Sequence, residues 1–297
     1  MQLPQGVLEM ADRGEAWSAW VARLPGVVRG LLEEWELRID GPAGHGYCAV
    51  VHPVRTAAGR PAVLKVGFPD QESEHESLAL QHWHGDGAVL LLRADPHRRA
   101  LLLERLHDEN LTELWDVEAC QVVGELYGRL HVPALPLLRR LSAELGEWRG
   151  ELEGMPRNAP VPRRLVEQSL AIARDLAVDE ATDGTLVHGD LHYDNVLAAD
   201  REPWLAIDPK PLSGDPHFEP APMLWNRWEE VVASGDVRDA VRRRFHTLVD
   251  TAGLDEDRAR DWAVLRVVLN AVWEIEDPEP DTSEITRSIT IAKAVQD

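Results

Sequence analysis

Residues 186–197, LVHGDLHYDNVL, place a polar loop between two short apolar segments in an otherwise helical half of the chain. The segment TLV (185–187) leads into the loop and NVLAA (195–199) follows it. The loop residues favour neither a helix nor a strand, so packing alone does not account for them. A third apolar segment, PWLAID (203–208), comes directly afterwards. A chain with this pattern needs a small β-hairpin embedded among helices.

Pairing NVLAA with WLAI through the turn DREP brings Asn195 and Asp208 to the same end of that hairpin. One amide oxygen and one carboxylate make a hard-oxygen site that suits Mg²⁺. Asp190 is then left to orient a hydroxyl group or to accept its proton. Phosphoryl transfer needs both features, because its catalysis rests on positioning and charge neutralisation. Structural roles compete with this interpretation, since Asp190 can cap a turn and Asn195 can bind loop backbone groups.

The first part of the chain is rich in predicted strands. Residues 15–37 carry apolar positions at helical spacing, and Pro25 favours two short helices over one long helix. Further along, the pattern predicts two hairpins and a helix, with strands at 48–54, 61–66, 88–94 and 100–106 and the helix at 71–83. We therefore expect a small strand-rich lobe over residues 1–103.

The second part is mostly helical. Amphipathic patterns predict helices within 111–132, 163–178 and 261–275, and the Pro-rich stretch 155–164 is expected to be a loop. The layout over residues 104–297 is that of a larger helical lobe around the embedded hairpin. The fold class predicted for the whole chain is therefore α+β in two lobes.

Composition limits the function further. The chain has 297 residues, of which 44% are hydrophobic, and a net charge of −21. This balance excludes general binding to nucleic acid or to an anionic membrane and is compatible with a cationic small substrate, although acidity also aids solubility. Cys48 and Cys120 give no metal-binding spacing and no disulfide framework. With no secretory signal pattern and no membrane-spanning run, we expect a cytoplasmic protein.

HGDLHYDN followed by IDPK resembles the catalytic loop and metal-binding aspartate of kinases. The longer stretch from HGDLHYDN to LWNRW, together with AVLKVG and ALLLERL, resembles the aminoglycoside phosphotransferase superfamily, in the branch of streptomycin 6-kinases and hydroxyurea phosphotransferases. This resemblance implies a bilobal, protein-kinase-like fold that uses ATP and Mg²⁺. It implies that Asp190 is the catalytic aspartate and that Asn195 and Asp208 bind the metal. His188 is expected to brace the loop through hydrogen bonds.

The resemblance also implies a nucleotide site in the first lobe. Lys65 is one of only three lysines and lies on the apolar strand AVLKV, where an unpaired charge is costly. Its implied partners are the ATP phosphates and a carboxylate of the next helix, for which Glu76 is our first choice and Glu72 the alternative. A lysine reaching water from a strand end is the competing interpretation.

Two further segments belong to this expected nucleotide site. GPAGHGYCAVV (41–51) takes the place of a glycine-rich loop, in which Gly44 and Gly46 are the candidate phosphate-binding positions; its spacing departs from G-x-G-x-x-G, and an ordinary turn looks the same. LLLERL (101–106) resembles the segment that joins the lobes. Backbone groups near Glu104 and Leu106 are therefore expected to bind the adenine edge.

For the acceptor, the carboxylates of Asp215 and Glu274 are the candidates, beside Glu219 and the aromatic rings of Trp225 and Trp228. Such groups suit a polyhydroxylated cation such as streptomycin. Tryptophans at helical spacing are also common in cores, and the acidic run EDPEPD is also typical of a solvated loop.

The predicted enzyme is a phosphotransferase that acts on an alcohol group, as a monomer or homodimer. The alternatives are a kinase of another hydroxylated metabolite or of hydroxyurea, and a catalytically silent nucleotide-binding protein.

Overall fold

The structure is a computed structural model that describes residues 3–296. The chain divides into two compact units, Met1–His107 and Asp108–Asp297. The first is rich in strands and the second is mostly helical, as the sequence predicts.

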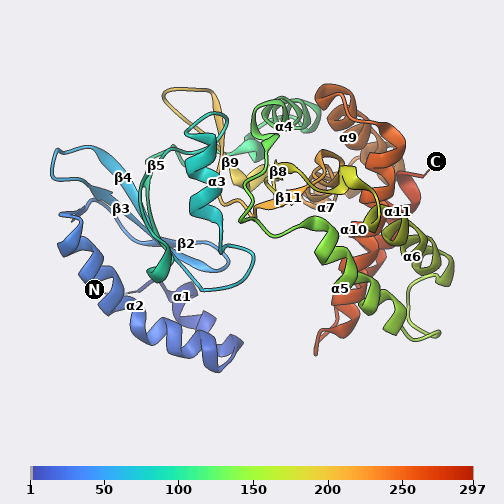
Figure 1. Ribbon diagram of the computed structural model, residues 1–297, viewed down its shortest axis with the longest axis horizontal. Coiled ribbons are helices and arrows are strands. Elements are labelled where there is room, and N and C mark those ends of the chain that lie inside the picture. The colour runs from blue at the N-terminus through green and yellow to red at the C-terminus, as the bar shows by residue number, and fades with distance from the viewer. Residues whose placement is uncertain (1–2, 297) are drawn as a thin grey trace. The chain divides into compact units, whose positions relative to one another are not determined.

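Unit 1 is a six-stranded antiparallel sheet with a helix packed against each face (Figure 1). The strand order is β1-β3-β4-β6-β5, and β2 pairs with β3. The strands are β1 (Arg38–Ile39), β2 (Gly44–His45), β3 (Ala49–Arg55), β4 (Pro61–Gly67), β5 (Leu91–Asp95) and β6 (Ala100–Glu104). The helical elements are α1 (Gln5–Glu9), η1 (Met10–Arg13), α2 (Glu15–Glu34), α3 (Glu76–Trp83) and η2 (Pro96–Arg98).

The alternation of side chains along β4 decides which helix each residue meets. Leu64 and Val66 point to the face covered by α2 and belong to its apolar core. Lys65 points to the opposite face and reaches α3. Strand periodicity therefore places a lysine beside a helix that carries a buried glutamate.

Residues 15–34 form one helix, so the expected break at Pro25 is wrong. The helix buries Trp20, Leu24, Val28 and Leu31 on both sides of the proline. A proline inside a helix costs about 3 kcal/mol, and packing of this continuous apolar stripe on the sheet offsets that cost. The predicted helix at 71–83 is also shorter than expected, because residues 72–75 form a turn before α3.

Unit 2 surrounds small strand pairs with helices. Its β-hairpin joins β9 (Val196–Ala198) to β10 (Trp204–Ala206), and a three-stranded sheet has the order β11-β8-β7. The strands of that sheet are β7 (Val132–Pro133), β8 (Thr185–Val187) and β11 (Leu212–Gly214). The short helical turns are η3 (Leu111–Glu113), η4 (Glu180–Thr182), η5 (Tyr193–Asn195) and η6 (Pro216–Phe218).

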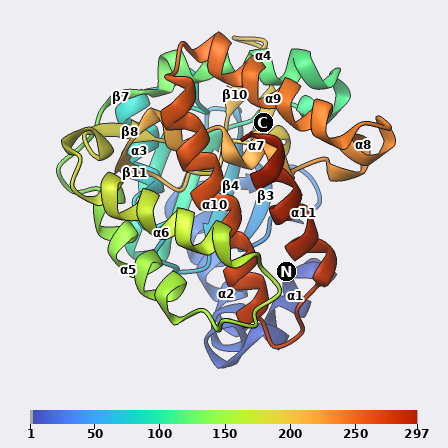
Figure 2. The same cartoon turned by 90° about the vertical axis from the view of Figure 1, so that its right-hand side faces the viewer.

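Helix α10 (Glu256–Glu276) runs through the middle of unit 2, with α5 and α6 on one side of it and α11 on the other (Figure 2). It is the longest helix described and buries residues on most of its circumference. The other helices are α4 (Asp116–Leu130), α5 (Leu141–Gly154), α6 (Arg163–Ala177), α7 (Ala221–Trp225), α8 (Trp228–Ala233), α9 (Val237–Ala252) and α11 (Thr282–Ala294).

Candidate active site

The predicted hairpin is present and brings Asn195 next to Asp208. Val196 pairs with Ala206 in antiparallel register, and the amide of Ile207 donates to the Asn195 carbonyl at 2.9 Å. Asp208 therefore leaves the hairpin at the end where Asn195 enters it. Its backbone has φ +57°, a left-handed conformation that aspartate tolerates better than most residues.

The side chain of Asn195 has a defined orientation. Its amide nitrogen donates to the Asp190 carbonyl at 2.8 Å and lies 3.1 Å from His192 Nε2. Since an amide has one oxygen and one NH₂ group, Oδ1 is the atom that remains for a cation. The Asp208 carboxylate has Lys210 Nζ at 4.0 Å.

This donor set fits Mg²⁺ chemically. Asn195 and Asp208 offer one amide oxygen and one carboxylate, both hard ligands. Within residues 3–296, no three His, Cys, Asp or Glu side chains gather into a self-contained metal centre. Mg²⁺ is commonly held by one or two protein oxygens while water and substrate phosphates complete its coordination, so the pair suits a metal that arrives with a nucleotide.

Asp190 lies in the loop between β8 and η5. Its side chain is 35% exposed, and His192 Nε2 lies 3.9 Å from Oδ2. Burial raises the pKa of Asp190, and electrostatic interactions with His192, Arg266 and Lys210 oppose that rise. A partly exposed carboxylate with a raised pKa is suited to accept a hydroxyl proton.

His188 braces this loop from within. The Asp190 amide donates to its Nδ1 at 3.3 Å, so the ring proton lies on Nε2, which donates to the Ile207 carbonyl at 2.9 Å. The ring is fully buried, and burial lowers its pKa to about 4. His188 is therefore a neutral link between the loop and the hairpin, as the sequence predicts.

Position 189 requires glycine, both for its backbone conformation and for lack of space. Its φ is +83°, and a Cβ there would lie 2.4 Å from the Lys210 carbonyl oxygen. The Lys210 amide also donates to the His188 carbonyl at 2.8 Å. The chain before Asp190 therefore runs against the chain after Asp208, with no room for a side chain between them.

Glu219 lies beneath the loop. Its carboxylate is fully buried and accepts from the amides of His188 and, at 3.2 Å, Gly189. Burial opposes its ionisation, but contacts with His131 and His188 hold the pKa of Glu219 below its ordinary value. The sequence interpretation offered Glu219 to the acceptor; the structure assigns it to the backbone of the loop.

In unit 1, Lys65 and Glu76 form a buried ion pair. Nζ lies 2.6 Å from Oε1, and the two side chains are 12% and 7% exposed. The alternative, Glu72, is exposed in the turn before α3. A buried lysine held by one carboxylate has its ammonium fixed in direction, which is what a phosphate ligand requires.

The other nucleotide candidates lie on the strands of unit 1. Gly44 begins β2 and Gly46 lies in the turn after it; both are exposed, and a Cβ at either would meet no atom within 4 Å. Internal packing therefore does not require glycine at these positions. Glu104 ends β6 and accepts from the Leu90 amide at 2.7 Å, and Leu106 follows it, half-buried.

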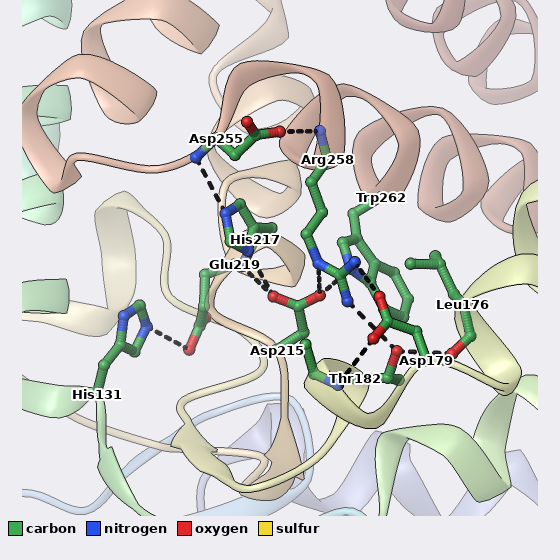
Figure 3. Close-up of polar contacts among 11 residues, drawn as sticks. His131, Leu176, Asp179, Thr182, Asp215, His217, Glu219, Asp255, Arg258 and Trp262 are labelled. Carbon is green, nitrogen blue, oxygen red and sulfur yellow. Dashed lines mark hydrogen bonds and ion pairs between the residues drawn. The ribbon is translucent and has the colours of Figure 1, made fainter.

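Asp215 is the hub of a buried network (Figure 3). Its Oδ2 accepts from Arg258 Nε and Trp262 Nε1, both at 2.6 Å, and its Oδ1 accepts from the His217 amide and ring. It is 1% exposed. These bonds join η6 to the first turns of α10, and both carboxylate oxygens already have protein donors, so we do not assign Asp215 to the acceptor.

Glu274, the other acceptor candidate, is half-buried near the end of α10 and accepts from the Asp281 amide at 2.5 Å. Its neighbour Trp273 is 43% exposed and donates to Glu151 of α5 at 2.7 Å.

Comparison with solved structures defines the fold class. The chain superposes on an amicoumacin kinase, solved in complex with AMP-PNP, Ca²⁺ and Ami, with a TM-score of 0.64 at 15% identity, covering 94% of each chain. The predicted α+β, bilobal, kinase-like fold is thereby confirmed. The loop and hairpin described above therefore belong to a kinase-like fold.

The sequence comparisons define the family. Residues 34–278 match the aminoglycoside/hydroxyurea antibiotic resistance kinases, and the chain belongs to this family. It is 42% identical to a streptomycin 6-kinase of Streptomyces glaucescens over 95% of this chain and 92% of that protein. It is 40% identical to a hydroxyurea phosphotransferase of Kitasatospora aureofaciens over 99% of this chain and 86% of that protein. The predicted family is therefore confirmed.

None of the helices described over residues 3–296 combines the length and apolar character needed to cross a bilayer.

Proposed function

We propose that this kinase transfers the γ-phosphate of Mg-ATP to a hydroxyl group of a streptomycin-like aminoglycoside. The acceptor is suggested by the relative named streptomycin 6-kinase at 42% identity. In the reaction, the acceptor oxygen bonds to the γ-phosphorus as the bond to ADP breaks, and the hydroxyl proton passes to Asp190.

The single observation that carries the proposal is that Asp190, Asn195 and Asp208 come together at one loop. Asn195 holds the Asp190 carbonyl at 2.8 Å, and the hairpin brings Asp208 beside Asn195. A carboxylate for the hydroxyl and two hard-oxygen ligands for the metal are thus within one short stretch of unit 2. We assign Asp190 to orienting the acceptor, and Asn195 and Asp208 to Mg²⁺, which neutralises phosphate charge when it is bound.

For the nucleotide, we assign Lys65 to the phosphates, with Glu76 holding its ammonium in place. We assign the segment with Gly44 and Gly46 to the phosphates as well, because the space beside both residues is open and a phosphate group can approach their backbone closely. Backbone groups near Glu104 and Leu106 are assigned to the adenine edge.

For the acceptor, we retain Glu274 as a carboxylate that binds a cationic group. The net charge of −21 favours a cationic acceptor of this kind. Hydroxyurea is the second candidate acceptor, because a named hydroxyurea phosphotransferase is 40% identical over 99% of the chain. We place the reaction in the cytoplasm, catalysed by a monomer or a homodimer.

The test measures ADP release from Mg-ATP with streptomycin, other aminoglycosides, hydroxyurea and no acceptor, and identifies the product by mass. Asp190→Asn is compared with Asp194→Asn, which makes the same change at a 60% exposed carboxylate in the adjoining turn η5. We expect streptomycin-dependent turnover that falls by about 10²- to 10⁴-fold in Asp190→Asn and stays near wild type in Asp194→Asn.

Turnover with hydroxyurea alone would show that hydroxyurea is the acceptor in place of streptomycin, and the proposed phosphoryl transfer would stand. ATP binding without turnover on any acceptor would favour the silent nucleotide-binding protein. A chain that does not bind Mg-ATP would overturn the proposal.

A further inference from the structure

One arginine interrupts the apolar part of helix α10. Between Asp261 and Glu274, Arg266 is the only charged residue. Its guanidinium lies over the ring of Phe218, 3.9 Å from the ring centroid, and 5.2 Å from that of Trp225. Stacking on two rings fixes the plane of the guanidinium and therefore the directions of its N–H groups.

Two of those N–H groups bind main-chain carbonyls from different elements. Nη1 donates to the Phe218 carbonyl at 3.1 Å, and Nη2 donates to the Gly189 carbonyl at 3.1 Å. The Gly189 carbonyl belongs to the peptide bond that leads into Asp190. The amide of the same peptide bond donates to His188 Nδ1 at 3.3 Å. Both polar atoms of this planar group are therefore held by side chains.

The preceding peptide bond is held as well, because the buried Glu219 carboxylate accepts from the Gly189 amide at 3.2 Å. Gly189 is thus bound by a carboxylate at its N–H and by a guanidinium at its carbonyl. The negative carboxylate thus meets the N–H of Gly189, and the positive guanidinium meets its carbonyl oxygen. Hydrogen bonds with a charged partner are stronger than those between neutral groups.

We propose that Arg266 is a positioning residue of the phosphoryl transfer: it fixes the Gly189–Asp190 peptide bond and so aims the Asp190 carboxylate. The inference rests on the proposed function of Asp190. The rotation of that peptide plane sets the direction in which the Asp190 side chain leaves the backbone. A misplacement of about 1 Å at a reacting group costs on the order of 10²-fold in rate. Arg266 acts here through the main chain, in addition to the effect of its charge on the pKa of Asp190.

The kinetic test compares Arg266→Met, Arg266→Lys and Arg260→Met. Arg260 is a matched control, because it is on the same helix and donates to a carbonyl, that of Val295, at 2.9 Å. We expect kcat to fall about 10- to 100-fold in Arg266→Met, with KM for ATP and for the acceptor within about threefold of wild type. Lysine keeps the charge but lacks the planar fork that reaches two carbonyls, so its kcat should be intermediate.

A kcat in Arg266→Met equal to that of Arg260→Met would overturn the inference. A raised KM for the acceptor with unchanged kcat would overturn it too, because it would make Arg266 a substrate contact.

A second measurement does not depend on activity. Hydrogen exchange is followed in a peptide covering residues 186–192, with no substrate present. Loss of the Arg266 bond should speed exchange of the amides beside Gly189 by about threefold or more, whereas Arg260→Met should not change it. Unchanged exchange in Arg266→Met would overturn the inference.

The two proposals fail in different ways. A wild-type chain that phosphorylates no acceptor counts against the proposed function, whereas the exchange result still decides whether Arg266 holds the loop. If Arg266→Met does not fold, Arg266→Lys is used for both measurements, with the same expected directions.

Discussion

The ammonium of Lys65 lies 2.6 Å from Oε1 of Glu76, and both side chains are almost completely buried. The pair forms because strand alternation turns Lys65 toward α3, on the sheet face opposite the core packed under α2. Its geometry is therefore fixed by the sheet before any nucleotide binds.

Removing the charge of Glu76 should weaken the use of ATP. Glu76→Gln leaves the Lys65 ammonium without this carboxylate, so kcat/KM for ATP should fall by about 10- to 100-fold, the cost of losing a buried charge partner. Steady-state kinetics with varied ATP measure this. The control is Glu74→Gln, at a side chain that is 50% exposed. Equal kcat/KM values for the two variants would contradict the prediction.

The buried His188 should make stability depend on pH. Its pKa is about 4 in the folded chain against 6.5 for the free group. The unfolded chain therefore takes up a proton between these values that the folded chain does not. Stability is complete above pH 6.5 and falls by about 3 kcal/mol as the pH drops to 4. Urea unfolding of wild type and His188→Gln should show a flatter curve for the variant; identical slopes would refute the assignment.

Two glycines with positive φ should differ in their tolerance of alanine. Gly189→Ala places a Cβ 2.4 Å from a carbonyl oxygen, whereas Gly184→Ala, at φ +111°, meets no atom within 4 Å. Backbone strain alone should cost Gly184→Ala about 1–2 kcal/mol of unfolding free energy, and the clash should raise the cost for Gly189→Ala to about 3 kcal/mol or more. Denaturant titration separates them, and equal costs would show that the loop moves aside.

Asp215→Asn should act on stability and leave acceptor binding unchanged. The change removes the charge that holds Arg258 and should lower the free energy of unfolding by about 3–5 kcal/mol. KM for the acceptor should remain that of wild type. Asp239→Asn, at a 66% exposed residue of α9, is the control and should cost less than about 0.5 kcal/mol. A raised KM in stable Asp215→Asn would restore the assignment made from sequence.

The sequence predicted the parts of the site that are local. The hairpin that joins Asn195 to Asp208 follows from three apolar segments and one turn, and Lys65 is conspicuous as a rare lysine on an apolar strand. The continuous helix through Pro25 was not predicted, because local propensity says nothing of the core that this helix meets.

The residues whose roles were not predicted correctly make contacts with residues that are distant in the sequence. Asp215 was predicted to bind the acceptor because it follows the metal motif closely, but Arg258 and Trp262 of α10 bind its carboxylate. Glu219 binds amides some thirty residues earlier, which no periodicity reveals. Arg266 could have been singled out from the sequence, because a lone charged residue in an apolar helix needs polar partners.

The Glu219 carboxylate accepts hydrogen bonds from two main-chain amides that precede Asp190, and its Oε1 also lies 3.7 Å from His131 Nε2. The shape of the Asp190 loop is thereby set by a fully buried carboxylate. Surface positions such as Trp273 of α10, which is exposed, and Glu151 of α5, which is half-buried, can then vary with little effect on the reacting groups. A scaffold whose catalytic loop is held from within tolerates change elsewhere, in keeping with a family that includes kinases named for an antibiotic as large as streptomycin and for a molecule as small as hydroxyurea.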